Sequence, residues 1–110
     1  IKLSDFTATP EEPMIGESVR VAVVATNTTD KSVRLLIDFA IDFVKANGTT
    51  SRKVFKGGEF ELGPQASESI AKTISVRQHT TRTHYPGVHD VYALVNGSTN
   101  SIGSFTLLPA

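Results

Sequence analysis

The chain has 110 residues, a formal net charge of zero and no cysteine, with 39% hydrophobic and 20% charged residues. This length suits one domain that buries roughly two thirds of its unfolded surface, and the balanced composition excludes an intrinsically disordered chain. Without cysteine, neither a disulfide framework nor a thiolate metal site can form, which favours a reducing cytoplasm. No apolar run approaches the roughly 18 to 20 residues that span a bilayer, so we expect no membrane contact. A chain that begins at Ile1 predicts a fragment of a longer protein, in which residues 1–110 form a single domain.

Charge is unevenly distributed along the chain. Residues 1–44 carry four basic and seven acidic side chains, whereas residues 45–89 carry seven basic and three acidic ones, and Asp90 completes the balance. If the basic side chains of the middle segment converge in the fold, they form a surface for anions or phosphates. A solvated surface of mixed charge is the alternative.

In chain order, residues 1–16 are predicted to be partly linker and partly first strand. The next segment, "SVRVAVVAT" (residues 18–26), alternates strictly, with Val19, Val21 and Val23 on one face. A period of two is what a half-buried strand requires. We therefore expect this segment to line a core.

The segment "LLIDFAIDFV", residues 35–44, fits two patterns. Helical spacing produces an apolar stripe but leaves Ile37 and Ile41 outside it. A period of two places the large side chains on one face, and β-branched and aromatic residues suit a pleated sheet. That face would hold Ile37, Phe39, Ile41 and Phe43. We predict a strand.

Of three further segments, residues 88–96 and 102–108 alternate in the same way, whereas residues 67–76 depart from the pattern. In "SESIAKTISV" (residues 67–76), Ile70 shares its face with Lys72. Either the lysine lies at the rim of the sheet with its ammonium in water, or a bulge changes the register. Residues 88–96 and 102–108 predict two more strands.

Turn-forming residues separate these segments at short intervals. They occur at residues 10–16, 27–31, 47–48, 57–58, 63–64, 86–87 and 96–97. Such spacing predicts an all-β domain of about seven to eight short antiparallel strands, packed as a sandwich of two sheets. The pair Gly57-Gly58 is interpreted as a turn, because it lacks the helix and spacing of a phosphate loop. Asn27, Asn47 and Asn96 each begin a glycosylation sequon, but they also fall at predicted turns.

The stretch "RQHTTRTHYPGVH", residues 77–89, concentrates the chemically active side chains. Its Tyr85, Pro86 and Gly87 immediately precede a predicted strand. A tyrosine in this position predicts a structural corner, in which its hydroxyl bonds a nearby backbone group. The proline extends the residue before it, and the glycine permits a positive φ.

Three histidines, His79, His84 and His89, are spaced five residues apart. Along a strand this spacing alternates faces, so the three would share a metal ion only if the loop folded back, and we predict no metal site. His89 has the parity of Val91, which predicts a hydrogen-bonded histidine at the rim of the sheet. No nucleophile elbow or glycine cradle accompanies the histidines, so we predict no catalytic residue and no cofactor. A His-dependent hydrolase is kept only as a third hypothesis.

The remaining candidates are cations. They are Lys45, Arg52, Lys53, Lys56, Arg77 and Arg82, with His84 beside the last two. If the loop after Val76 lies near the hairpin that follows Lys45, these side chains border one end of the sandwich and bind phosphates or a carboxylate-rich partner. The alternative is that the two arginines of the loop pair with Asp38 and Asp42 and hold the loop in place.

Two long stretches resemble a known family. "LLIDFAIDFVKANGTTSRKVFK" and "RQHTTRTHYPGVHDVYALVNG" are similar to the C-terminal domain of bacterial DNA alkylation repair proteins, and the likeness covers roughly residues 17–108. The positions that match the family's motifs are Lys45, Lys53, Phe55, Lys56, Arg77, Thr80, Thr81, Arg82, His84, Tyr85 and Gly87.

The resemblance implies an immunoglobulin-like sandwich that follows an N-terminal domain of helical HEAT-like repeats in a cytoplasmic bacterial protein. In that family the DNA-binding surface and the base-excision chemistry belong to the helical portion, so no catalytic residue is carried over to this chain. We expect a non-catalytic accessory domain whose partners are the helical-repeat domain of the same protein and duplex DNA. A purely structural or protein-interaction module is the alternative.

Overall fold

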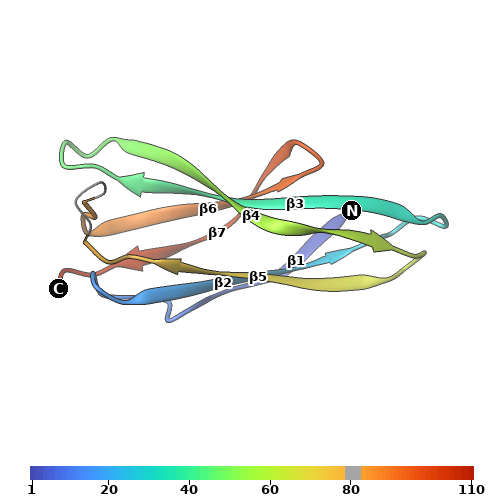
Figure 1. The fold of residues 1–110 in the computed structure, drawn as a ribbon, viewed down its shortest axis with the longest axis horizontal. Coiled ribbons are helices and arrows are strands. Elements are labelled where there is room, and N and C mark those ends of the chain that lie inside the picture. The colour runs from blue at the N-terminus through green and yellow to red at the C-terminus, as the bar shows by residue number, and fades with distance from the viewer. Residues whose placement is uncertain (79–82) are drawn as a thin grey trace.

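The computed structural model describes residues 1–78 and 83–110, which form seven strands in two sheets (Figure 1). The strands are β1 (Lys2–Thr9), β2 (Ser18–Thr26), β3 (Val33–Val44), β4 (Thr50–Leu62), β5 (Ser67–Ser75), β6 (Gly87–Val95) and β7 (Ser98–Leu107). Neighbouring strands pair antiparallel, in a three-stranded sheet of order β1-β2-β5 and a four-stranded sheet of order β4-β3-β6-β7. The predicted all-β sandwich is confirmed.

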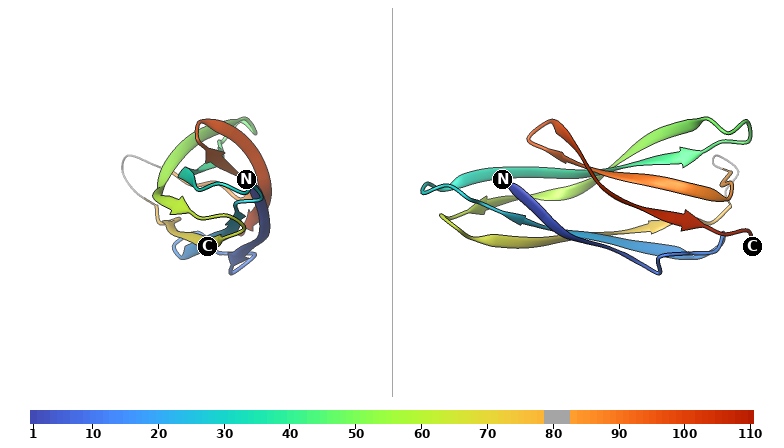
Figure 2. Two further views of the ribbon diagram at one scale, coloured as in Figure 1. Left: turned by 90° about the vertical axis from the view of Figure 1, so that its right-hand side faces the viewer. Right: turned by 180° about the vertical axis from the view of Figure 1, so that it is seen from behind.

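The sandwich is elongated, with extents of 47 × 23 × 20 Å, and most of its connections gather at the two ends of the long axis (Figure 1). One end holds the β3–β4 turn, residues 45–49, and the described part of the β5–β6 connection; we call it the basic end. The opposite end holds the β2–β3 and β4–β5 turns; we call it the Asn27 end. Figure 2 shows the C-terminus at the basic end and the N-terminus in the opposite half of the molecule, toward the Asn27 end.

The core lies between the sheets and is lined by the predicted alternating faces. Val19, Val21 and Val23 of β2 are at most 1% exposed. Ile37, Phe39, Ile41 and Phe43 of β3 are all buried as well. The strand prediction for residues 35–44 is confirmed, and its apolar face packs inward because a period of two matches the pleat.

Gly57 and Gly58 do not form a turn, contrary to the prediction. They lie inside β4, where the ladder with β3 shifts register: Ile37 pairs with Gly58 and Asp38 pairs with Lys56. Gly57 is the extra residue of this bulge. A Cβ atom there would lie 2.6 Å from the carbonyl oxygen of Ile37, so a glycine is required by close approach of the two backbones.

Lys72 lies at the rim of the three-stranded sheet. The β2–β5 ladder is continuous from Ser18–Ser75 to Thr26–Ser67, with Lys72 opposite Val21. No register shift occurs in this ladder, so the bulge alternative is excluded. Because β5 is an edge strand, its half-buried lysine can reach water while its stem covers the core.

The Asn27 end is closed by a fully buried side chain. Nδ2 of Asn27 donates to the carbonyl oxygens of Lys31 at 2.7 Å, and of Leu62 and Gly63 at 3.0 Å each. Its Oδ1 accepts from the backbone N–H and the hydroxyl of Thr29. One amide therefore joins the β2–β3 turn to the β4–β5 turn, which confirms the turn interpretation of this sequon and leaves no room for a glycan.

Candidate basic site at the β3–β4 turn

An open depression at the basic end brings together part of the predicted cationic set. It has a volume of about 310 Å³ and is lined by Phe43, Lys45, Arg52, Lys53 and Thr83, among others. The first four belong to β3, β4 and the turn between them, whereas Thr83 comes from the β5–β6 connection. The predicted meeting of the loop after Val76 with the hairpin that follows Lys45 is therefore present in the fold (Figure 1).

The turn that carries Lys45 is held by its own hydrogen bonds. The backbone N–H of Lys45 donates to the carbonyl oxygen of Thr49 at 2.8 Å, and the N–H of Gly48 donates to that of Lys45 at 3.0 Å. The Asn47 side chain closes the loop by accepting from the Thr49 hydroxyl at 2.6 Å. The backbone beneath the Lys45 ammonium is therefore fixed, while its side chain is exposed.

Lys53 lies on the edge strand β4 with an inward parity. It pairs with Ile41, whose side chain belongs to the core, so Lys53 extends along the inner rim of the sheet. Its ammonium lies 5.4 Å from the centre of the Phe55 ring, within the range of a cation–π contact. Lys53 remains exposed and has no carboxylate partner within the described part of the chain.

Arg52 differs from the two lysines because a carboxylate compensates its charge. Its Nε donates to Oδ1 of Asp42 at 2.8 Å and its Nη2 donates to Oδ2 at 3.2 Å. The guanidinium also lies over the Tyr92 ring, 4.2 Å from its centre. The hydrogen bond from Arg52 lowers the pKa of Asp42, and partial desolvation raises the pKa of Tyr92.

The predicted pairing of loop arginines with Asp38 and Asp42 is wrong for Arg77. Asp42 binds Arg52, and Asp38 accepts a hydrogen bond from the backbone N–H of Gly57 at 3.3 Å. Arg77 is exposed, with its backbone N–H 3.4 Å from the Ser75 hydroxyl. Sequence parity could not reveal these partners, because each pair joins positions brought together only by strand pairing.

One further member of the predicted set, Lys56, does not line the depression, and another, Arg82, falls outside the described residues, together with His79. Lys56 is exposed on β4, opposite Asp38, which places it farther along the outer face of the sheet. Of the five predicted cations that the structure describes, the depression thus brings together Lys45, Arg52 and Lys53.

The connection beside the depression is anchored by Gln78 and His84. The Gln78 side chain acts like a strand partner: its Oε1 accepts from the backbone N–H of His84 at 2.8 Å, and its Nε2 donates to the His84 carbonyl at 3.0 Å. The His84 ring lies 5.4 Å from the Phe43 ring and the residue is 3% exposed. His84 is therefore part of the packing beneath the depression rather than of the exposed cationic surface for which it was a candidate.

His89 lies in the core, so its predicted rim position is wrong. It is fully buried, with its ring stacked on Phe105 at 5.2 Å and perpendicular to Phe43 at 5.5 Å. The hydrogen bond that was expected is present, between Nδ1 and the carbonyl oxygen of Gly87 at 3.0 Å. Burial lowers the pKa of His89, because the cationic form would lose its hydration.

The Tyr85-Pro86-Gly87 segment leads directly into β6. Gly87 has a φ of +142°, a conformation that disfavours other residues. The Tyr85 hydroxyl makes no hydrogen bond to another residue that the structure describes, so its corner role stays a prediction. Within the described ranges, no three histidine, aspartate or glutamate side chains form a group that could hold a metal ion. A helix able to cross a membrane is also absent from those ranges.

Sequence reasoning missed three residues that shape this site. Gln78 anchors the connection, Phe43 contacts the rings of His84 and His89, and Thr83 lines the depression together with the lysines. Phe43 carried a signal, since its parity predicted a buried position. The role of Thr83 depends on neighbours that are distant along the chain, and that of Gln78 depends on a side-chain-to-backbone pairing. No periodicity indicates either relation.

Comparisons with known proteins identify relatives of this domain. Residues 2–109 match the family described as "Uncharacterised protein YhaZ, C-terminal Ig-like domain". The chain is 38% identical over 97 residues to the uncharacterized protein YhaZ of Bacillus subtilis (strain 168), a match that covers 88% of this chain and 27% of that protein. The chain thus spans less than a third of this relative.

Solved structures extend the comparison. The Pseudomonas fluorescens alkylpurine DNA glycosylase AlkC, bound to DNA containing an abasic site analog, contains a similar domain with a TM-score of 0.89 and 37% identity, over 97% of this chain and 30% of that chain. A β-glucosidase from Erythrobacter marinus has a TM-score of 0.77 at 15% identity over 97% of this chain and 15% of that chain, which shows a shared fold alone. The predicted resemblance to bacterial DNA alkylation repair proteins is confirmed. The chain belongs to the family of YhaZ C-terminal Ig-like domains.

Proposed function

We propose that this domain is a non-catalytic accessory domain that contacts the phosphates of duplex DNA through the basic end. The observation that carries the proposal is the convergence of Lys45 and Lys53 on one open depression that Thr83 also lines. Both lysines lack a carboxylate partner among the described residues, and Thr83, which carries a hydroxyl, also lines the depression. Lysine ammonium groups and hydroxyls are ordinary donors to DNA phosphates.

The relatives support DNA as the anion. AlkC, which shares this domain at 37% identity, is a DNA glycosylase and was solved bound to DNA. The family resemblance adds a helical-repeat domain N-terminal to this one as the second partner. In this proposal the helical domain performs the chemistry, and the sandwich adds phosphate contacts beside it.

The burial of the histidines argues against an independent hydrolase. His84 is 3% exposed and His89 is fully buried, so neither described imidazole reaches the depression as a free base. A second candidate function, a protein-interaction module, is favoured by a different observation. Leu36, Val54 and Val88 are about half exposed on the outer face of the four-stranded sheet, where a protein partner could cover them.

The test of the DNA proposal is fluorescence anisotropy of the chain with a labelled duplex at low and moderate salt. Each lysine that neutralises one phosphate contributes about 0.9 to the slope of log affinity against log salt, so two lysines predict a slope near −2. Lys53→Glu should weaken binding and reduce this slope by about one. Lys31→Glu at the Asn27 end changes the net charge equally and should leave binding nearly unchanged.

Two results would contradict the proposal. One is the absence of salt-dependent binding. The other is an equal loss of DNA affinity in Lys31→Glu and Lys53→Glu. Equal losses would show that binding depends on net charge and not on the basic end, and the protein-interaction module would then be the better candidate.

A further inference from the structure

Two Asn-Gly dipeptides occupy hairpin turns, and the two asparagine side chains differ in how they are held by hydrogen bonds. Asn47-Gly48 lies in the β3–β4 turn at the depression, and Asn96-Gly97 lies in the turn between β6 and β7. Both asparagines are exposed. In such a dipeptide the backbone nitrogen of glycine can attack the side-chain carbonyl carbon of asparagine, because glycine offers no side chain that obstructs the approach.

The reaction balances without a cofactor. The glycine nitrogen forms a bond to Cγ of asparagine while the bond from Cγ to Nδ2 breaks, and the amide nitrogen leaves as ammonia with the proton that the glycine nitrogen gives up. Water then opens the resulting five-membered ring at either carbonyl. The product is aspartate or isoaspartate at the former asparagine, with one added negative charge.

Asn47 is restrained only by its own turn. Its Oδ1 accepts from the backbone N–H of Thr49 at 3.2 Å and from the Thr49 hydroxyl at 2.6 Å. Donors at this oxygen stabilise the negative charge that develops on it during the attack. Within the described residues its Nδ2 has no hydrogen bond, so the attack disturbs only bonds inside this turn, namely those from Thr49 to Oδ1 and the bond from Gly48 N–H to the Lys45 carbonyl.

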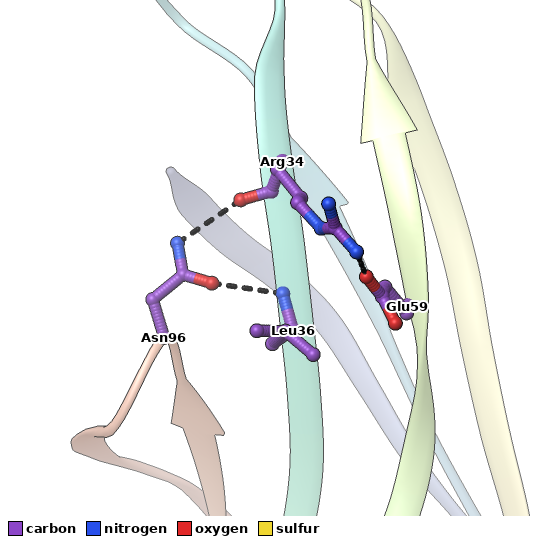
Figure 3. Close-up of polar contacts among 4 residues, drawn as sticks. All are labelled: Arg34, Leu36, Glu59 and Asn96. Carbon is purple, nitrogen blue, oxygen red and sulfur yellow. Dashed lines mark hydrogen bonds and ion pairs between the residues drawn. The ribbon is translucent and has the colours of Figure 1, made fainter.

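Asn96 is restrained by a neighbouring strand (Figure 3). Its Oδ1 accepts from the backbone N–H of Leu36 at 2.8 Å, and its Nδ2 donates to the carbonyl oxygen of Arg34 at 3.2 Å. The backbone N–H of Asn96 also donates to the Leu36 carbonyl at 2.8 Å. Its side-chain amide thereby extends the β3–β6 ladder. An ion pair between Arg34 and Glu59 joins β3 to β4 beside it.

We infer that Asn47 is a site of spontaneous deamidation in the folded protein and that Asn96 is protected from the same reaction. The attack requires the side-chain carbonyl to rotate toward the following nitrogen. At Asn47 this rotation breaks contacts inside a single exposed loop. At Asn96 it breaks two hydrogen bonds to β3, which should slow the reaction about tenfold relative to Asn47.

Deamidation at Asn47 would also alter the depression, a consequence that rests on the proposed function. The new carboxylate would stand in the turn between Lys45 and the start of β4, two residues after a lysine that lines the depression. At surface separations, one added anion near a phosphate should weaken DNA binding about fivefold at low salt. The reaction would then act as an irreversible loss of the phosphate contact as the protein ages.

The experiment is peptide mapping by mass spectrometry after incubation of the folded chain at mildly alkaline pH. We expect the peptide with Asn47 to gain the mass of an amide-to-acid change about ten times faster than the peptide with Asn96. The same chain unfolded in urea is the control, and there the two sites should react at similar rates. Equal rates in the folded chain, or faster reaction at Asn96, would overturn the inference.

A second measurement separates this inference from the proposed function. Asn47→Asp mimics the product, and Asn47→Gln blocks ring closure by lengthening the side chain. Weaker DNA binding by Asn47→Asp but not by Asn47→Gln supports the consequence for the depression. If Asn47 deamidates selectively but the unmodified chain binds no DNA, the modification site stands and the proposed function fails. If the chain binds DNA but Asn47 does not deamidate, the proposed function stands and the modification site fails.

Discussion

The two ends of the sandwich use polar side chains in opposite ways. At the Asn27 end a buried amide directs its hydrogen bonds to backbone groups of two turns. At the basic end the buried positions are taken by His84, His89 and Phe43, and the cations above them point to solvent. The comparison indicates that one end holds the sheets together, while the other is built to present charge.

The same contrast exists between neighbouring cations of β4. Arg52 is bound by Asp42, whereas Lys53 has no carboxylate partner in the described residues. An internal pair stabilises a surface only weakly, because water screens the charges. An uncompensated cation is available for a ligand. Substitutions at the two ends can test this division of roles.

The largest effect is expected at the Asn27 end. Asn27→Ala should lower the free energy of unfolding by about 3 kcal/mol, because buried carbonyl oxygens lose their donor. Urea unfolding measures the change. Asn47→Ala removes a comparable but exposed turn contact and should cost less than about 1 kcal/mol. Equal losses of unfolding free energy in Asn27→Ala and Asn47→Ala would contradict the view that the Asn27 end in particular holds the sheets together.

A smaller effect is expected at the anchor of the basic end. Gln78→Ala should lower the free energy of unfolding by about 1.5 kcal/mol, because both backbone groups of His84 lose a partner. Hydrogen exchange at the His84 amide should become faster. Gln78→Met keeps the length of the side chain without its hydrogen bonds and should behave like Gln78→Ala. Recovery of stability by methionine would assign the effect to packing instead.

The buried His89 predicts a loss of stability in acid. Burial holds its pKa below the ordinary 6.5, so the unfolded chain binds more protons than the folded one as the pH falls through that value. The contribution of His89 to the free energy of unfolding should therefore be constant above about pH 6.5 and should decrease below that pH. Thermal unfolding at several pH values measures this. His89→Phe should flatten the dependence, and an unchanged slope would show that another group causes it.

The smallest effect is expected from the compensated pair. Asp42→Asn combined with Arg52→Gln keeps the net charge and should change the free energy of unfolding only slightly, because the Arg52 side chain is 43% exposed and water screens the pair. DNA affinity should change little. Lys45→Gln combined with Lys53→Gln should instead reduce both the affinity and its salt dependence. If the variant at Asp42 and Arg52 lost more DNA affinity than the variant at Lys45 and Lys53, the DNA contact would instead lie on the outer face of the four-stranded sheet.

Local sequence predicted the strands well where one face of a sheet is buried. The alternation in β2 and β3 has the same period as the pleat, so the apolar side chains of the two predicted inner faces are buried as expected. The position of Lys72 follows the same rule. Its parity pointed inward, and only its place on an edge strand decided that the ammonium reaches water.

The predictions for Gly57 and His89 were wrong for the same reason, because residues of other strands decide the structure at both positions. Gly57 was taken for a turn because glycine pairs often form turns, but the β3–β4 register and the close carbonyl of Ile37 make it a bulge. For His89, the parity shared with Val91 predicts a hydrogen-bonded histidine at the rim, but the residue is fully buried. Its burial comes from Phe43 and Phe105, which belong to other strands.

By itself the sequence determined the class of fold, the inward faces of the strands and the presence of a basic middle segment, because these depend on composition and on a local period of two. Tertiary structure decided which cations meet and which are neutralised. Strand pairing brought Asp42 to Arg52 and left Lys45 and Lys53 uncompensated beside Thr83. Electrostatic interaction depends on distances of a few ångströms in space, and positions along the chain do not fix those distances.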